Sequence, residues 1–171
     1  MSTFMQILKS LFLQLLIIAI VFNGVSALRE MGMLSSWMKQ QAPDFHLTSL
    51  HSEQVNLQQM LGKQKTVLYF FAPWCSVCKF SMGNLQSLHD KKASADFKVI
   101  AIALDYVDHD EVTDFVKDME LTMPVLFGNQ ALKQRYQVSA YPSYYVVDNN
   151  QQVIHRSMGY STELGLFLRT L

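Results

Sequence analysis

The chain has 171 residues, half of them hydrophobic, which suffices for one domain with a real core and a short appendage. Basic and acidic residues are balanced at 14 each, and no basic face with interleaved aromatic residues stands out, which argues against a nucleic acid partner. Two cysteines cannot form the disulfide framework of a loop-rich scaffold, so their spacing points to redox chemistry or to a metal.

The N-terminal part contains an uncharged stretch, residues 10–28, between Lys9 and Arg29. As a helix, these residues would extend about 28 Å, close to the roughly 30 Å of a bilayer's hydrocarbon core. Residues 1–30 are therefore expected to be a membrane anchor. A cleaved signal peptide is the alternative, because Val25-Ser26-Ala27 has the small residues of a processing site. In both cases the remainder of the chain is expected to be exported.

The rest of the chain is expected to form a linker, residues 31–42, in which Trp37 could lie at the lipid headgroups, and a globular domain, residues 43–171. Hydrophobic periodicity predicts the elements of this domain. In chain order they are strands at 45–47 and 54–56, a helical turn at 57–61, a strand at 66–72, a helix at 75–91, a strand at 97–104, helices at 108–119 and 130–136, a hairpin of strands at 143–147 and 152–156, and a helix at 162–171. Strands that alternate with helices indicate an α/β sheet with helices on both faces.

Cys75 and Cys78 stand where the apolar strand meets the following helix. A helix N-terminus favours a thiolate, so the pKa of Cys75 is expected to fall from about 8.5 toward the range of roughly 3.5 to 7.5. Cys75 is the predicted nucleophile, and Cys78, one turn deeper, is the predicted resolving thiol that attacks the mixed disulfide. Ser76 and Val77 add no charge to the pair, which favours a disulfide reductase over a disulfide oxidant, near the reducing end of the about −270 to −120 mV scale.

A metal site is the main alternative to redox chemistry. Two soft thiolates can chelate Cu(I), so a Cu(I)-binding or copper-tolerance module remains a second hypothesis. Zinc is disfavoured because no second cysteine pair or histidine pair at ligand spacing accompanies the motif, and no metal is expected in the domain. Four acids at the start of the helix at 108–119 are explained by stabilisation of its first turn rather than by calcium: Asp105, Asp108, Asp110 and Glu111.

Three stretches carry a resemblance to a known family: Ala42-Pro43-Asp44-Phe45, Trp74-Cys75-Ser76-Val77-Cys78-Lys79 after an aromatic-rich strand, and Tyr141-Pro142-Ser143 before another strand. Over roughly residues 42–171 the chain resembles the exported thioredoxin-like disulfide oxidoreductases. Its ending, residues 159–169, is similar to that of the bacterial membrane-anchored branch called suppressor of copper sensitivity protein D, near the anchored reductases of cytochrome c maturation. The resemblance implies a thioredoxin-like fold: a central mixed sheet flanked by helices, with an N-terminal hairpin extension and one N-terminal hydrophobic helix.

The resemblance also implies roles for residues outside the cysteine pair. Pro142 would be a cis-proline facing the dithiol, a conformation that the sequence alone would not predict, and the backbone of Tyr141 would pair with an extended substrate segment. Trp74 would shield the sulfurs and contact substrate, unless it is a core aromatic. Two residues depart from the family pattern. Tyr69 stands where cytoplasmic thioredoxins keep a buried acid and the anchored reductases often have asparagine, and its hydroxyl is a poorer proton acceptor near neutral pH. Tyr141 is bulkier than the residue usual before this proline and would restrict substrates or shield the sulfurs.

Partners and location follow from the same resemblance. The substrates would be exported proteins with disulfides, and a membrane thiol-reducing protein would supply electrons. No cofactor beyond the redox-active cysteine pair is expected. The chain would cross the bacterial inner membrane once, with its catalytic domain in the periplasm, or it would be soluble in the periplasm if the N-terminal segment is cleaved.

Overall fold

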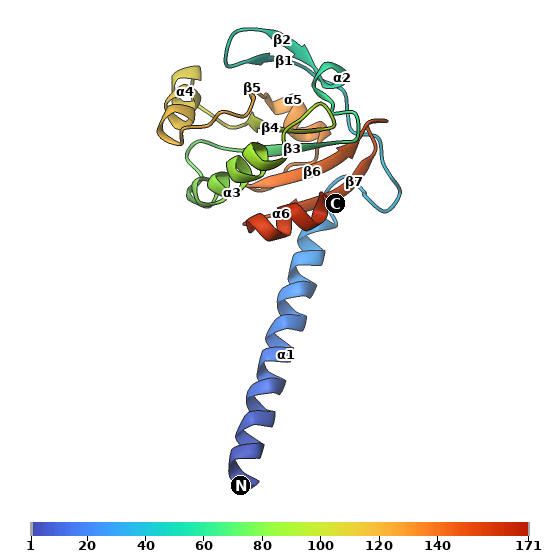
Figure 1. Cartoon of the computed structure of the whole chain (residues 1–171), viewed down its shortest axis with the longest axis vertical. Coiled ribbons are helices and arrows are strands. Elements are labelled where there is room, and N and C mark those ends of the chain that lie inside the picture. Colours follow the sequence, from blue (N-terminus) through green and yellow to red (C-terminus); the bar gives the residue numbers. More distant parts are fainter. Residues whose placement is uncertain (1, 171) are drawn as a thin grey trace. The chain divides into compact units, whose positions relative to one another are not determined.

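The computed structural model describes residues 2–170 of the chain, which divides into two compact units, Met1–Gly32 and Met33–Leu171. In the first unit, Ser2–Glu30 form a single helix, α1 (Figure 1). Its described side chains are nearly all exposed. These side chains are those of residues 6, 7, 9–21, 24, 25 and 28–30. Within the described residues, no helix combines the length and the apolar character needed to cross a membrane, so the expected spanning helix is not confirmed.

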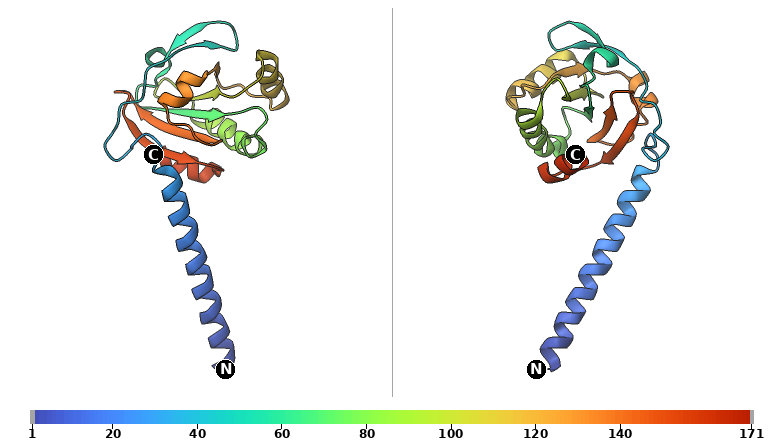
Figure 2. Two further views of the ribbon diagram at one scale, coloured as in Figure 1. Left: turned by 180° about the vertical axis from the view of Figure 1, so that it is seen from behind. Right: turned by 45° about the vertical axis from the view of Figure 1, so that its right-hand side comes forward.

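The second unit is built on a mixed seven-stranded sheet in the order β2-β1-β5-β4-β3-β6-β7 (Figures 1 and 2). Strands β3, β4 and β5 run parallel to one another, and all other neighbours in the sheet are antiparallel. The strands are β1 His46–Ser49, β2 Gln54–Asn56, β3 Lys65–Phe71, β4 Phe97–Ala103, β5 Val125–Phe127, β6 Ser143–Asp148 and β7 Val153–Met158. The predicted α/β class, mixed sheet and N-terminal hairpin are therefore confirmed.

Helices cover both faces of this sheet, which explains why its central strand is apolar throughout. The helices are α2 Leu57–Met60, α3 Ser76–Lys92, α4 His109–Asp118, α5 Gln130–Arg135 and α6 Glu163–Arg169. Tyr69 and Phe71 of β3 belong to one buried cluster with residues of α3, α4 and α6, whereas Leu68 and Phe70 belong to another with residues of α2 and α5. Alternate side chains of β3 thus enter opposite cores, as in strands buried on both sides.

The expected linker is in part an extension of the domain. Met33 and Leu34 are only 3% and 1% exposed, and Arg156 donates from Nη1 to the backbone oxygens of both residues, at 2.8 and 3.1 Å. The backbone nitrogen of Leu34 also donates to the hydroxyl of Tyr145, at 3.2 Å. By contrast, Trp37 is 96% exposed. The folded domain therefore begins at Met33, ten residues earlier than the sequence suggested.

Candidate active site

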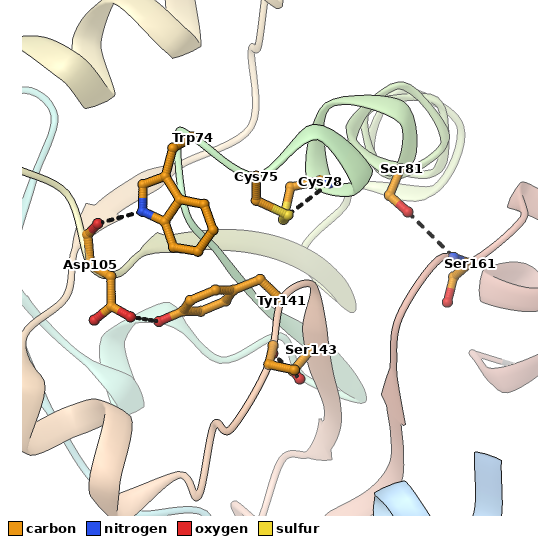
Figure 3. Close-up of a disulfide and its surroundings, with 9 residues drawn as sticks. Trp74, Cys75, Cys78, Ser81, Asp105, Tyr141, Ser143 and Ser161 are labelled. Carbon is orange, nitrogen blue, oxygen red and sulfur yellow. Dashed lines mark hydrogen bonds between the residues drawn. A yellow bond between two sulfur atoms is a disulfide. The ribbon is translucent and has the colours of Figure 1, made fainter. Parts of the chain in front are cut away.

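The cysteine pair lies at the carboxyl end of β3, where the chain turns into α3 (Figure 3). Cys75 is the N-cap residue of α3, and its sulfur accepts a hydrogen bond from the backbone nitrogen of Cys78 at 3.1 Å. The backbone nitrogen of Cys75 donates to the oxygen of Ala72 at 3.0 Å, which fixes the turn out of the strand. The first sulfur is therefore held at a helix N-terminus, where the helix dipole favours negative charge.

Cys75 and Cys78 form a disulfide, with their Cα atoms 5.2 Å apart. The two residues differ in access to solvent, because Cys75 is 7% exposed and Cys78 is fully buried. Cys75 is therefore better placed than Cys78 to meet an incoming thiol or disulfide. The arrangement suits sequential exchange, in which one sulfur bonds to a partner and the other releases it.

The peptide bond between Tyr141 and Pro142 is cis, as the family resemblance implied. The pair stands directly before β6, and Ser143, the first residue of that strand, lies opposite Phe70 of β3. Pro142 is buried, whereas Tyr141 is partly exposed and packs against the cluster that contains both cysteines. The structure thus brings the segment predicted to bind substrate to the same end of the sheet as the disulfide (Figure 3).

Trp74 is not the core aromatic considered as an alternative, because its side chain is 61% exposed. Its ring stands edge-on to that of Tyr141, with the centroids 5.9 Å apart and the planes at 82°. Edge-to-face contact is a favoured geometry for two aromatic rings. All five residues predicted to form the site therefore lie together: Trp74, Cys75, Cys78, Tyr141 and Pro142.

Asp105 joins Trp74 to Tyr141, a role that the sequence analysis missed. Its backbone oxygen accepts from the indole nitrogen of Trp74 at 2.8 Å, and its carboxylate accepts from the hydroxyl of Tyr141 at 3.0 Å and pairs with Lys133. Burial and then the neighbouring carboxylate raise the pKa of Tyr141 above its ordinary value, so this hydroxyl stays protonated and donates. The strand-end position after β4 was an available indication, since the carboxyl ends of parallel strands meet at one edge.

The comparisons with known proteins agree with this geometry. Residues 38–156, well over half of the chain, match the family described as AhpC/TSA. The chain belongs to the AhpC/TSA family. Relatives of this AhpC/TSA protein include the thioredoxin-like protein YneN of Bacillus subtilis, 34% identical over 113 residues, a match that covers 64% of this chain and 64% of YneN. The thiol-disulfide oxidoreductase ResA of Oceanobacillus iheyensis is 29% identical over 152 residues, with 86% of this chain and 78% of ResA covered. The matched part thus spans less than two thirds of YneN.

Solved structures support the same fold. StoA from Bacillus subtilis matches with a TM-score of 0.66 and 23% identity, over 76% of this chain and 98% of StoA. A DsbF homologue from Corynebacterium diphtheriae matches with a TM-score of 0.70 and 19% identity, over 81% of this chain and 89% of the homologue. The chain has a disulfide between Cys75 and Cys78, and several of its relatives are named thiol-disulfide oxidoreductases. We therefore conclude that this AhpC/TSA protein is a thioredoxin-like thiol-disulfide oxidoreductase.

Behind the disulfide of this AhpC/TSA protein lies a group of buried hydroxyls. Tyr69 is 1% exposed, and burial raises its pKa far above the ordinary value, an effect that the neighbouring Ser81 side chain partly offsets. Despite this proximity, neither the hydroxyl of Tyr69 nor that of Ser161 has a hydrogen-bond partner among the described residues. Ser81 accepts from the backbone nitrogen of Ser161 at 3.3 Å (Figure 3). Tyr69 is therefore neutral at physiological pH and unsuited to accept a proton.

Within residues 2–170, no group of three or more histidine, cysteine, aspartate or glutamate side chains is arranged to hold a metal ion. The acids before α4 act as expected from the sequence in one respect: Asp108 is the N-cap residue of α4 and accepts from the backbone nitrogen of Glu111 at 2.9 Å. Asp105 differs from the other acids, because its carboxylate contacts Tyr141 and Lys133 and not the N-terminus of α4.

Proposed function

We propose that the protein is a disulfide reductase of exported proteins, with Cys75 as the nucleophile and Cys78 as the resolving thiol. The observation that carries this proposal is the position of Cys75 at the N-terminus of α3, where it is less buried than Cys78, which is fully buried. Trp74 and the Tyr141-Pro142 segment would bind the substrate polypeptide around the reactive sulfur. No cofactor is needed, since the two sulfurs carry both electrons.

The reaction follows from these positions. The Cys75 thiolate of the reduced protein attacks one sulfur of the substrate disulfide, and the other substrate sulfur leaves as a thiolate that takes up a proton. Cys78 loses its proton and attacks the Cys75 sulfur, which forms the intramolecular disulfide and releases the second substrate thiol. Two electrons pass to the substrate. A thiol reductant must then reduce the Cys75–Cys78 disulfide, and we propose that a membrane thiol-reducing protein supplies it.

The roles of the two cysteines can be separated by substitution. Cys75→Ser should abolish reduction of insulin disulfides, because the nucleophile is lost. Cys78→Ser should still capture insulin but should accumulate a mixed disulfide, visible on a non-reducing gel, because nothing resolves it. The control is the unmodified protein under the same reductant. Insulin reduction by Cys75→Ser at the rate of the unmodified protein would contradict the assignment.

The equilibrium redox potential of the cysteine pair tests whether the protein reduces or oxidises its substrates. The side chains between the cysteines, Ser76 and Val77, carry no charge that would stabilise the thiolate further, so we expect a potential nearer about −270 mV than about −120 mV. Equilibration with glutathione buffers, followed by thiol trapping, measures it. A potential at the oxidising end would favour the alternative of a disulfide oxidant.

A titration with Cu(I) tests the copper-binding alternative. Tight one-to-one Cu(I) binding without any exchange activity would favour that alternative.

Location in the bacterial inner membrane, with the domain in the periplasm, is part of the same proposal. Its support is the uncharged, largely apolar stretch of residues 10–28 in α1. Retention of the segment gives a single-pass anchor, and its cleavage gives a soluble periplasmic enzyme. Kinship with the anchored reductases of cytochrome c maturation, or with the branch of suppressor of copper sensitivity protein D, belongs to this proposal as well.

A further inference from the structure

Asp105 occupies an unusual position beside the disulfide. It follows β4 with a φ of 50°, in the left-handed region that aspartate tolerates better than most residues. The backbone nitrogen of Leu104 donates to the oxygen of Phe71 at 2.8 Å, which brings the chain after β4 next to the chain after β3. In this conformation the backbone oxygen of Asp105 reaches Trp74 while its carboxylate reaches Tyr141 (Figure 3).

Lys133 closes the arrangement from α5. Its ammonium group pairs with the Asp105 carboxylate and lies 5.3 Å from the centre of the Tyr141 ring, within the range of a cation–π contact. The side chains of Lys133 and Asp105 are 23% and 32% exposed, so water screens the pair only in part. Asp105 therefore links three side chains from separate parts of the chain. Its carboxylate contacts Tyr141 and Lys133, and its backbone oxygen contacts Trp74.

Each aromatic residue of this cluster is next in sequence to a residue of the site. Trp74 precedes Cys75, and Tyr141 precedes the cis-proline. A polypeptide whose disulfide reaches Cys75 must pass these rings, whereas a small disulfide need not contact both. Rings that are already fixed lose less conformational freedom when a polypeptide binds, which strengthens that binding selectively.

We propose that Asp105 is a positioning residue that fixes Trp74 and Tyr141 as a rigid binding wall and makes the enzyme prefer polypeptide disulfides to small ones. The proposal rests on the proposed reductase function of the Cys75–Cys78 pair. Asp105 itself takes no part in bond exchange, and Lys133 acts by holding its carboxylate in place.

The preference for a polypeptide disulfide over a small disulfide tests the proposal. The second-order rate constants for oxidation of the reduced protein by insulin and by glutathione disulfide are compared in Tyr141→Phe and Asp105→Asn. Tyr141→Phe deletes only the hydroxyl, and Asp105→Asn removes the charge but suits the same left-handed backbone. We expect the insulin-to-glutathione ratio to fall about fivefold in Tyr141→Phe, which corresponds to about 1 kcal/mol, the net contribution of a typical hydrogen bond. In Asp105→Asn, the added Tyr141→Phe change should have a smaller effect.

Tyr106→Phe is the matched control, because Tyr106 follows Asp105 and its hydroxyl donates to the backbone oxygen of Gly128 at 3.0 Å, outside the cluster. Its ratio should equal that of the unmodified protein. A second readout uses Trp74 as the single tryptophan after Trp37→Phe: its fluorescence anisotropy should fall in Tyr141→Phe and not in Tyr106→Phe.

The outcomes distinguish the positioning role from the reductase function. An unchanged ratio in Tyr141→Phe, or an equal fall in Tyr106→Phe, would overturn the role of Asp105 and leave the reductase proposal intact. A parallel fall of both rate constants would also overturn it, since the change would then act on exchange itself. If the unmodified reduced protein reacted with neither disulfide, the reductase function and the positioning role would both be wrong.

Discussion

Tyr69 shows how one buried side chain constrains the chemistry of the pair. It belongs to the same buried cluster as Cys78, and its pKa is raised by burial, so it remains a neutral phenol at physiological pH. The position six residues before Cys75 therefore holds a side chain that does not accept a proton at physiological pH. The proton that Cys78 loses before it attacks must leave through another group or through solvent admitted when substrate binds.

The same residue gives a stability prediction. A buried hydroxyl without a partner costs folding free energy, because it gives up its hydrogen bonds to water. Tyr69→Phe should therefore leave the free energy of unfolding unchanged or raise it by about 1 kcal/mol. Tyr145→Phe is the matched control, since the equally buried Tyr145 donates to the oxygen of Tyr136 at 2.6 Å and accepts from Leu34. That change should cost about 2 kcal/mol.

Urea denaturation of the oxidised proteins measures both changes, with the slope against urea checked for constancy. An equal loss of stability in the two variants would mean that the Tyr69 hydroxyl is hydrogen-bonded in solution, and the prediction would be wrong.

At the scale of elements, the sequence predicts what local pattern determines. The central strand, predicted at 66–72, and the helix after the cysteines, predicted at 75–91, occur as β3 and α3 within one residue at each end. By contrast, β5 was not predicted. It has only three residues, Val125–Phe127, too few to show a period, and it becomes a strand by pairing with β4 on one side and β1 on the other.

The residues of the site likewise differ in whether the sequence could predict them. The cysteine pair could be predicted because its position at a strand-to-helix junction is local in sequence, and the cis-proline followed from the family resemblance. The contacts of Asp105 could not, because they join residues 28 to 36 positions apart: Trp74, Lys133 and Tyr141. Only the sheet order, which places β4 beside β3, brings these side chains to one place.

For the molecule as a whole, the structure moves the start of the folded domain. The sequence predicted a linker over residues 31–42, in which Trp37 could lie at the lipid headgroups. In the fold, Met33 and Leu34 are buried against the sheet face covered by α5, and Gln41 pairs with Gln152 at the edge of β7. Met33, Leu34 and Ala42 are thus part of the core beside β6 and β7, and segment 33–42 belongs to the domain, whatever the role of residues 1–32.

A shortened chain tests this boundary. A protein that starts at Met33 should keep the full stability of the domain. One that starts at Pro43 should lose about 4 kcal/mol, because burial of each large apolar side chain is worth about 1.5 to 3 kcal/mol.

Substitutions in the protein that starts at Met33 test the same boundary. Leu34→Ala should cost about 3 kcal/mol, while Trp37→Ala, at a residue 96% exposed, should change stability by less than about 0.5 kcal/mol. Urea midpoints of the oxidised proteins compare them. Equal midpoints for Leu34→Ala and Trp37→Ala would show that residues 33–42 are a linker after all, because only a packed segment distinguishes a buried side chain from an exposed one.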